Sequence, residues 1–115
     1  MASNSELRIF ITGDFFPGGG RVRALAVEED AESLFGPLLP KLQEADLTIT
    51  NLESPAIDGG EPIQKTGPAL KSPVKTLNVL KEGGFDLVTL ANNPIIDYGN
   101  EELTSTLEAC NTFGI

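Results

Sequence analysis

The sequence contains no histidine and no tryptophan, and it has a single cysteine, Cys110. Without histidine, the chain cannot build a Ser-His-Asp, Cys-His or His-Glu-x-x-His catalytic site from its own residues. A single cysteine excludes an intramolecular disulfide and a cysteine-based zinc site, and we expect Cys110 to be a buried apolar thiol. Any metal ion that this chain binds alone must therefore be held by oxygen or amide ligands.

Basic side chains are also scarce, since 8 lysines and arginines face 17 acidic residues and give a formal net charge of −9. An acidic surface repels phosphate backbones and anionic lipid headgroups, so nucleic acid and membrane surfaces are not expected partners. Neither a secretory signal nor an apolar run of membrane-spanning length is present. We therefore expect a cytoplasmic chain, an expectation that leaves open a membrane-associated or exported parent protein.

The length of 115 residues, with 40% hydrophobic and 22% charged residues, predicts a single globular domain over residues 1–115. Short apolar, β-branched runs predict strands at residues 7–12, 46–53 and 85–91. Helical patterns follow each run: residues 28–45, divided into two short pieces by Gly36-Pro37 and Pro40; a helix capped by Ser72; and a last helix from Asn100 to a stop at Gly114.

Alternating strands and helices predict an α/β fold with a parallel sheet built from βαβαβα units. Parallel sheets normally carry helices on both faces, which implies a three-layer arrangement. Because three strands make a thin sheet, we expect the chain to be a truncated domain, the first half of a larger sheet. The stretch from residue 57 to 71 has no strand or helix pattern, and connections of this length are more often functional than idle.

Polar side chains occur at the end of each predicted strand. The first run leads to Asp14, the second to Asn51 and Glu53, and the third to Asn92 and Asn93. The carboxyl ends of parallel strands lie along one edge of a sheet, where ligands bind. Carboxylate and amide oxygens suit hard or borderline divalent cations. The alternative is that turns after buried strands simply favour polar residues.

Four segments, taken in order, resemble one known family. They are residues 12–14 (Thr-Gly-Asp), 51–55 (Asn-Leu-Glu-Ser-Pro), 84–93 (ending in Ala-Asn-Asn) and 96–99 (Ile-Asp-Tyr-Gly). They resemble the CapA family of poly-gamma-glutamate capsule synthesis proteins, which is similar to the calcineurin-like metallophosphoesterases. The resemblance runs from Leu7 to Ile115, and it implies that the chain is the N-terminal part of a metallophosphoesterase-like fold.

The resemblance implies a two-metal site for Mn, Fe, Zn or Mg at the strand ends. By position in the motifs, Asp14, Glu53 and Asn93 correspond to metal ligands, whereas Asn51 and Asn92 correspond to supporting or substrate-contacting residues. In such sites the metal ions activate a water molecule and stabilise charge during displacement at phosphorus. The implied substrate is an anionic small molecule or polymer.

Pro94 stands where the family has a histidine after the two asparagines. Proline cannot protonate a leaving group or bind a metal ion. The family's later histidine-bearing motifs would follow Ile115, so we expect no catalytic residue, weak or absent metal binding and little or no hydrolase activity in this chain.

Two alternatives to a hydrolase remain. The first is a non-enzymatic module that keeps the fold. Its unpaired sheet edge would pair with another chain, including a second copy of this one, or its strand-end cleft would bind a ligand. The second is a flavodoxin-like receiver domain, which is disfavoured because no lysine follows a later predicted strand.

Overall fold

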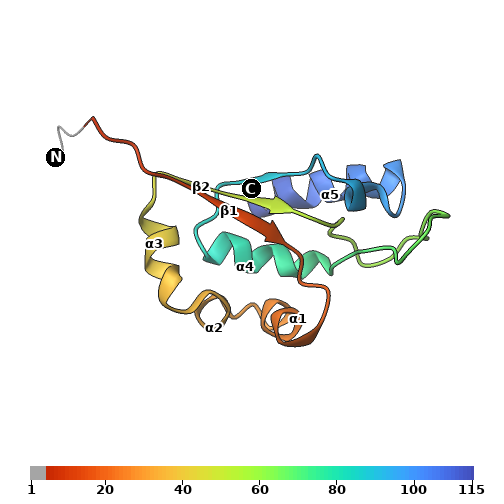
Figure 1. The fold of residues 1–115 in the computed structure, drawn as a ribbon, viewed down its shortest axis with the longest axis horizontal. Helices are drawn as coiled ribbons and strands as arrows, with labels where there is room; N and C mark the ends of the chain where they lie inside the picture. The colour runs from red at the N-terminus through yellow and green to blue at the C-terminus, as the bar shows by residue number, and fades with distance from the viewer. Residues whose placement is uncertain (1–4) are drawn as a thin grey trace.

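The computed structural model describes residues 5–115 and alternates strands with helices along the chain (Figure 1). The elements are β1 Ile9–Phe15, α1 Gly20–Val27, α2 Ala31–Phe35, the 3-10 helix η1 Gly36–Leu38, α3 Leu39–Glu44, β2 Leu47–Leu52, the 3-10 helix η2 Val74–Thr76, α4 Leu77–Glu82, β3 Leu87–Thr89, the 3-10 helix η3 Asn93–Ile96 and α5 Asn100–Phe113.

The strands form a 3-stranded sheet in the order β1-β2-β3. Both neighbouring pairs are parallel, with Ile9 opposite Leu47 in one and Ile49 opposite Leu87 in the other. The helices between the strands provide the crossover that parallel neighbours require. The predicted α/β class and the parallel sheet are thus confirmed.

Helices α1 to α4 lie on one side of the sheet (Figure 1), and α5 packs beside α4. Side chains of β2 alternate accordingly, since Thr48, Thr50 and Leu52 are buried whereas the residues between them are only partly buried. On the opposite face, Ile11 is 77% exposed and Leu87 is 42% exposed. Within residues 5–115 the helices therefore cover one face of the sheet, and the predicted third layer is not among them.

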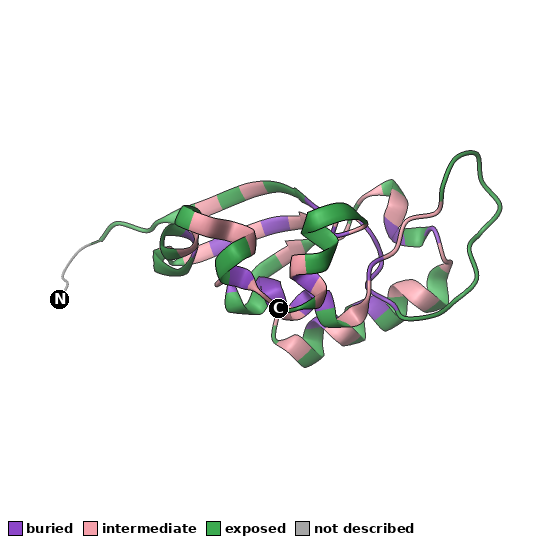
Figure 2. Ribbon diagram, turned by 90° about the horizontal axis from the view of Figure 1, so that it is seen from below, coloured by how far each residue is buried: buried purple, intermediate pink, exposed green. Residues whose placement is uncertain are grey.

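The core lies between the sheet and this helical layer, as the buried segments in Figure 2 show. Leu52 of β2 and Leu77, Val79 and Leu80 of α4 have no exposed surface. Cys110 of α5 is 4% exposed and belongs to the same cluster, which confirms the predicted buried thiol. These contacts hold the strands in the register that sets up their carboxyl ends.

The break at Gly36-Pro37 is confirmed, because α2 ends at Phe35 and a 3-10 turn separates it from α3. Helix α1 was not predicted, since it begins at Gly20, the last of three consecutive glycines, which obscured its start. The prediction that Ser72 caps the next helix was wrong. Its hydroxyl lies 3.1 Å from that of Ser54, and the Asp58 carboxylate instead accepts a hydrogen bond from the Val74 N–H.

The long connection between β2 and η2 is confirmed as a loop, and residues 58–68 of it are exposed (Figure 2). Its two ends meet in a parallel bridge between Ala56 and Ser72. Within residues 5–115, no helix is both long enough and apolar enough to cross a membrane.

Candidate metal centre

Strand β1 contains a bulge immediately before Asp14. Ile11 lies opposite Ile49 and Asp14 lies opposite Asn51, so three steps along β1 match two steps along β2. A bulge of this kind bends the strand and changes which face its side chains occupy. The expectation that the strand ends at Thr12 and that Asp14 lies in a turn was wrong, because the strand resumes after the extra residue and runs to Phe15.

Two threonine hydroxyls hold the bulge in place. The Thr50 hydroxyl donates a hydrogen bond of 2.7 Å to the carbonyl of Gly13, and the Thr12 hydroxyl donates one of 3.1 Å to the carbonyl of Ile49. As a result, Phe15 is buried opposite Leu52, whereas Asp14 is exposed opposite Asn51. The bulge therefore presents the Asp14 carboxylate to solvent while the apolar end of β1 stays in the core.

Asn51 links the three strand ends. Its side-chain amide donates to Oδ1 of Asp14 at 2.8 Å, and its own Oδ1 accepts from the Thr89 hydroxyl at 2.9 Å and from the Asn92 amide at 3.1 Å. A bridging amide of this kind fixes the orientation of the groups on either side of it. The structure therefore brings Asp14, Asn51 and Asn92 together, as the strand-end argument predicted.

Asn92 fixes the turn that follows β3. Its amide nitrogen also donates to the Leu52 carbonyl at 2.8 Å, and its Oδ1 accepts from the Ile95 N–H at 3.1 Å. The second bond caps η3, in which Pro94 occupies an early position. Both ends of the Asn92 side chain are thus engaged, and the turn that begins at Asn93 is attached to β2.

The three predicted ligands keep most of their oxygen atoms free. Asp14 accepts the one hydrogen bond from Asn51, and among the described residues the side chains of Glu53 and Asn93 make no hydrogen bond or ion pair. Asp14 and Asn93 are exposed, and Glu53 is partly buried. The Glu53 N–H donates to the Phe15 carbonyl at 3.1 Å, which attaches this residue to the end of β1.

This donor set fits a hard divalent cation better than a zinc-type site. It consists of carboxylate and amide oxygens, which Mg²⁺, Mn²⁺ and Ca²⁺ accept, and it contains no imidazole or thiolate. Within residues 5–115, no group of three or more His, Cys, Asp or Glu side chains is placed to hold a metal ion. By its chemistry, this donor set suits a hard cation that keeps part of its water shell, and a pair of metal ions would need further ligands.

Sequence reasoning missed Thr12, Thr50 and Thr89 as parts of this site. Threonine is common in strands because of its shape, so its presence there carries no signal of a hydrogen-bonding role. Only the bulge reveals that the first two hydroxyls hold Asp14 in place.

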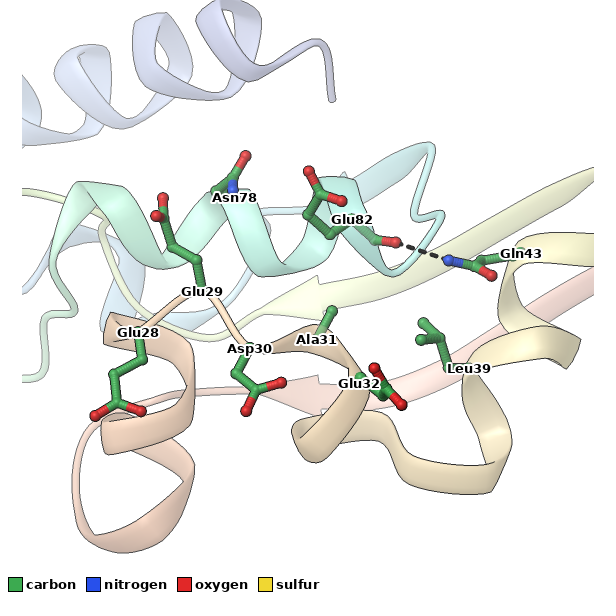
Figure 3. A pocket seen from close by; sticks show the side chains of 9 residues that line it. All are labelled: Glu28, Glu29, Asp30, Ala31, Glu32, Leu39, Gln43, Asn78 and Glu82. Carbon is green, nitrogen blue, oxygen red and sulfur yellow. Dashed lines mark hydrogen bonds between the residues drawn. The ribbon is translucent and has the colours of Figure 1, made fainter.

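A separate cavity of about 520 Å³ lies on the helical side of the molecule (Figure 3). Five carboxylates line it, together with Ala31, Leu39, Gln43 and Asn78; they belong to Glu28, Glu29, Asp30, Glu32 and Glu82. Asp30 caps α2, and hydrogen bonds from Ser33 lower the pKa of its carboxyl group. None of the strand-end residues borders this cavity, so it is distinct from the candidate metal centre.

The fold and the strand-end residues together define a parallel α/β domain with a polar cluster at the carboxyl edge of its sheet. The family model described as "Bacterial capsule synthesis protein PGA_cap" matches residues 8–115, and the chain belongs to this family. A relative from Bacillus anthracis, "Capsule biosynthesis protein CapA", is 28% identical over 109 residues. That match covers 92% of this chain and 26% of the relative, so the chain spans about a quarter of that protein's length.

Proposed function

We propose that this chain is the ligand-bearing N-terminal part of a metal-dependent phosphoesterase-type CapA protein that acts in capsule polymer synthesis. Its strand-end cluster would bind one hard divalent cation through Asp14, Glu53 and Asn93. The intact protein would act on an anionic phosphoester or polymer substrate. When bound, the cation would polarise a phosphoryl oxygen or activate a water molecule.

One observation carries the metal-binding part of this proposal: the polar groups at the strand ends fall into two sets. Asn51 and Asn92, the predicted supporting residues, use both ends of their amides in hydrogen bonds. Asp14, Glu53 and Asn93, the predicted ligands, retain free oxygens. Polar residues that only form turns would not be expected to fall into these two sets, because their side chains normally hydrogen-bond to the nearby backbone.

We further propose that this chain alone has no hydrolase activity. The sequence has no histidine, and Pro94 provides neither a proton nor a metal ligand. The side chains at the strand ends can bind and orient, and the sequence has no histidine to act as a general acid. Turnover of a simple phosphodiester by the purified chain with Mn²⁺ would contradict this part of the proposal.

The alternative is a non-enzymatic module that binds a ligand or another protein without a metal ion. The observation in its favour is that, within residues 5–115, no group of three or more acidic, histidine or cysteine side chains is placed to hold a metal ion. Such a module would bind Mn²⁺ no more tightly than any acidic surface does.

Titration calorimetry with Mn²⁺ distinguishes the two. We expect the heat of binding to disappear in Asp14→Ala, and the affinity to fall about 10-fold in Asn51→Ala, because loss of an orienting group weakens metal sites by that order. Glu44→Ala is the matched control, since Glu44 is an exposed residue of α3 and its removal changes the net charge equally. Identical traces for wild type, Asp14→Ala and Glu44→Ala would refute the metal site and favour the alternative.

A further inference from the structure

Asp97 is buried at the end of the turn that follows Asn93, and it is 1% exposed. A carboxylate in such a position is costly unless it is paired and fully hydrogen-bonded. Its Oδ1 lies 2.8 Å from Nζ of Lys65, and its Oδ2 accepts a hydrogen bond of 2.8 Å from the N–H of Leu70. Both oxygens of the carboxylate are thus bonded to the long loop between β2 and η2.

The backbone of Asp97 joins the same structures. Its carbonyl accepts a hydrogen bond of 2.8 Å from the N–H of Ile63, and its own N–H donates to the Pro94 carbonyl at 3.0 Å. Three positions of an otherwise exposed loop, residues 63, 65 and 70, therefore converge on one residue. The Lys71 ammonium reinforces the attachment, because it lies 5.2 Å from the centre of the neighbouring Tyr98 ring.

The turn that carries Asp97 is attached to the sheet at its other end. Asn92 bonds to Asn51 and to the Leu52 carbonyl, and its Oδ1 accepts from Ile95 within the same turn. The exposed Asn93 lies between these two attachments. The short turn from Asn92 to Asp97 is thus held by β2 on one side and by the loop on the other.

We propose that Asp97 is a positioning residue, which fixes the loop of residues 58–71 against the Asn92–Asp97 turn and thereby holds Asn93 in place for a cation at the strand ends. The part that concerns the cation rests on the proposed function. The attachment of the loop does not depend on it. Lys65 is consequently a structural counter-ion of Asp97 rather than a free cation for an anionic substrate.

Two substitutions break the ion pair from opposite sides. Asp97→Asn removes a negative charge and Lys65→Met removes a positive one, so their long-range effects on Mn²⁺ binding have opposite signs. If Asp97 holds Asn93 in place for the cation, both variants bind Mn²⁺ more weakly, by about 5-fold or more. Lys75→Met is the control for Lys65→Met, since Lys75 is exposed in η2 and its loss changes the charge equally. We expect this control to bind Mn²⁺ at least as tightly as wild type.

Hydrogen exchange without metal tests the attachment itself. Because the Leu70 and Ile63 amides donate to Asp97, we expect their exchange to quicken by about 10-fold or more in Asp97→Asn and in Lys65→Met, and to stay unchanged in Lys75→Met. Unchanged exchange in the first two variants would overturn the attachment.

The Mn²⁺ measurements decide the positioning role separately. Faster exchange with wild-type Mn²⁺ affinity in both variants, or affinities that change in opposite directions, would overturn it. A wild-type chain that binds no Mn²⁺ would refute the proposed function and the positioning role with it, while the exchange experiment would still decide whether Asp97 holds the loop.

Discussion

Gly84, between α4 and β3, is a position where an added methyl group should be strongly destabilising. Its φ angle is +87°, which L side chains rarely adopt. A Cβ at this position would lie 2.9 Å from the Cα of Gln43 and 3.2 Å from the carbonyl oxygen of Leu42, both atoms of the α3 backbone. The Gln43 side chain also donates to the Glu82 carbonyl at 3.0 Å (Figure 3), so α3 cannot move away without losing that bond.

Two contributions add up in Gly84→Ala. Forcing alanine into the left-handed region costs about 1–2 kcal/mol, and overpacking against a backbone costs about 1–3 kcal/mol more. Gly67 is a matched control because its φ angle is also +87°, but no heavy atom lies within 4 Å of its added Cβ. We therefore expect only the first of these two costs to lower the free energy of unfolding in Gly67→Ala, and both costs to lower it in Gly84→Ala.

Urea denaturation followed by circular dichroism measures the two free energies of unfolding. The expected difference between the two variants is about 1–3 kcal/mol, with unchanged dependence on urea concentration. Equal losses in both variants would show that the φ angle alone matters and that α3 does not press against Gly84. A loss that is larger for Gly67→Ala would refute the packing of α3 on this turn altogether.

Two further predictions concern the core and its thiol. Leu80→Ala should lower the free energy of unfolding by about 2–5 kcal/mol because Leu80 is fully buried. Ile11→Ala, on the open face of the sheet, should change it by less than about 0.5 kcal/mol. Similar losses of unfolding free energy for the two variants in urea denaturation would contradict a core on one face only. Burial raises the pKa of the Cys110 thiol above its ordinary 9.0, so the unfolded chain loses the thiol proton first as the pH rises. The free energy of unfolding should therefore fall as the pH rises above 9.0. Cys110→Ala should lose less stability over that range, and equal pH profiles for the two chains would contradict the raised pKa of Cys110.

Much of the fold follows from patterns in the sequence that have a direct physical meaning. The apolar, β-branched runs at β1 and β2 indicate strands, and Gly36-Pro37 interrupts the helical pattern that it falls within. Helix α1 was missed because its glycines hide its start, and its sequence offers no charged or polar cap. β3 is shorter than predicted, since only three of its residues pair with β2.

The candidate site was predicted in outline because the ends of parallel strands must meet. Asp14, Asn51 and Asn92 do meet, but the bonds that join them could not be inferred from spacing. Each hydrogen bond that holds the bulge joins residues 37 positions apart in the sequence, and the attachment at Asp97 depends on a lysine 32 positions away. Such contacts depend on tertiary packing, which local sequence propensity does not predict.

The extra residue in β1 also determines how sequences related to this one should be aligned. Without Gly13, Asp14 would take the place opposite Asn51 in an uninterrupted ladder, so an alignment gap at this position leaves the orientation of every side chain intact. The same gap placed at Phe10 would reverse the side-chain faces of the residues before it, so that side chains on the solvent side would point to the core side and the reverse. A single-residue length difference in this segment therefore keeps the side-chain faces of the strand at one point and exchanges them elsewhere.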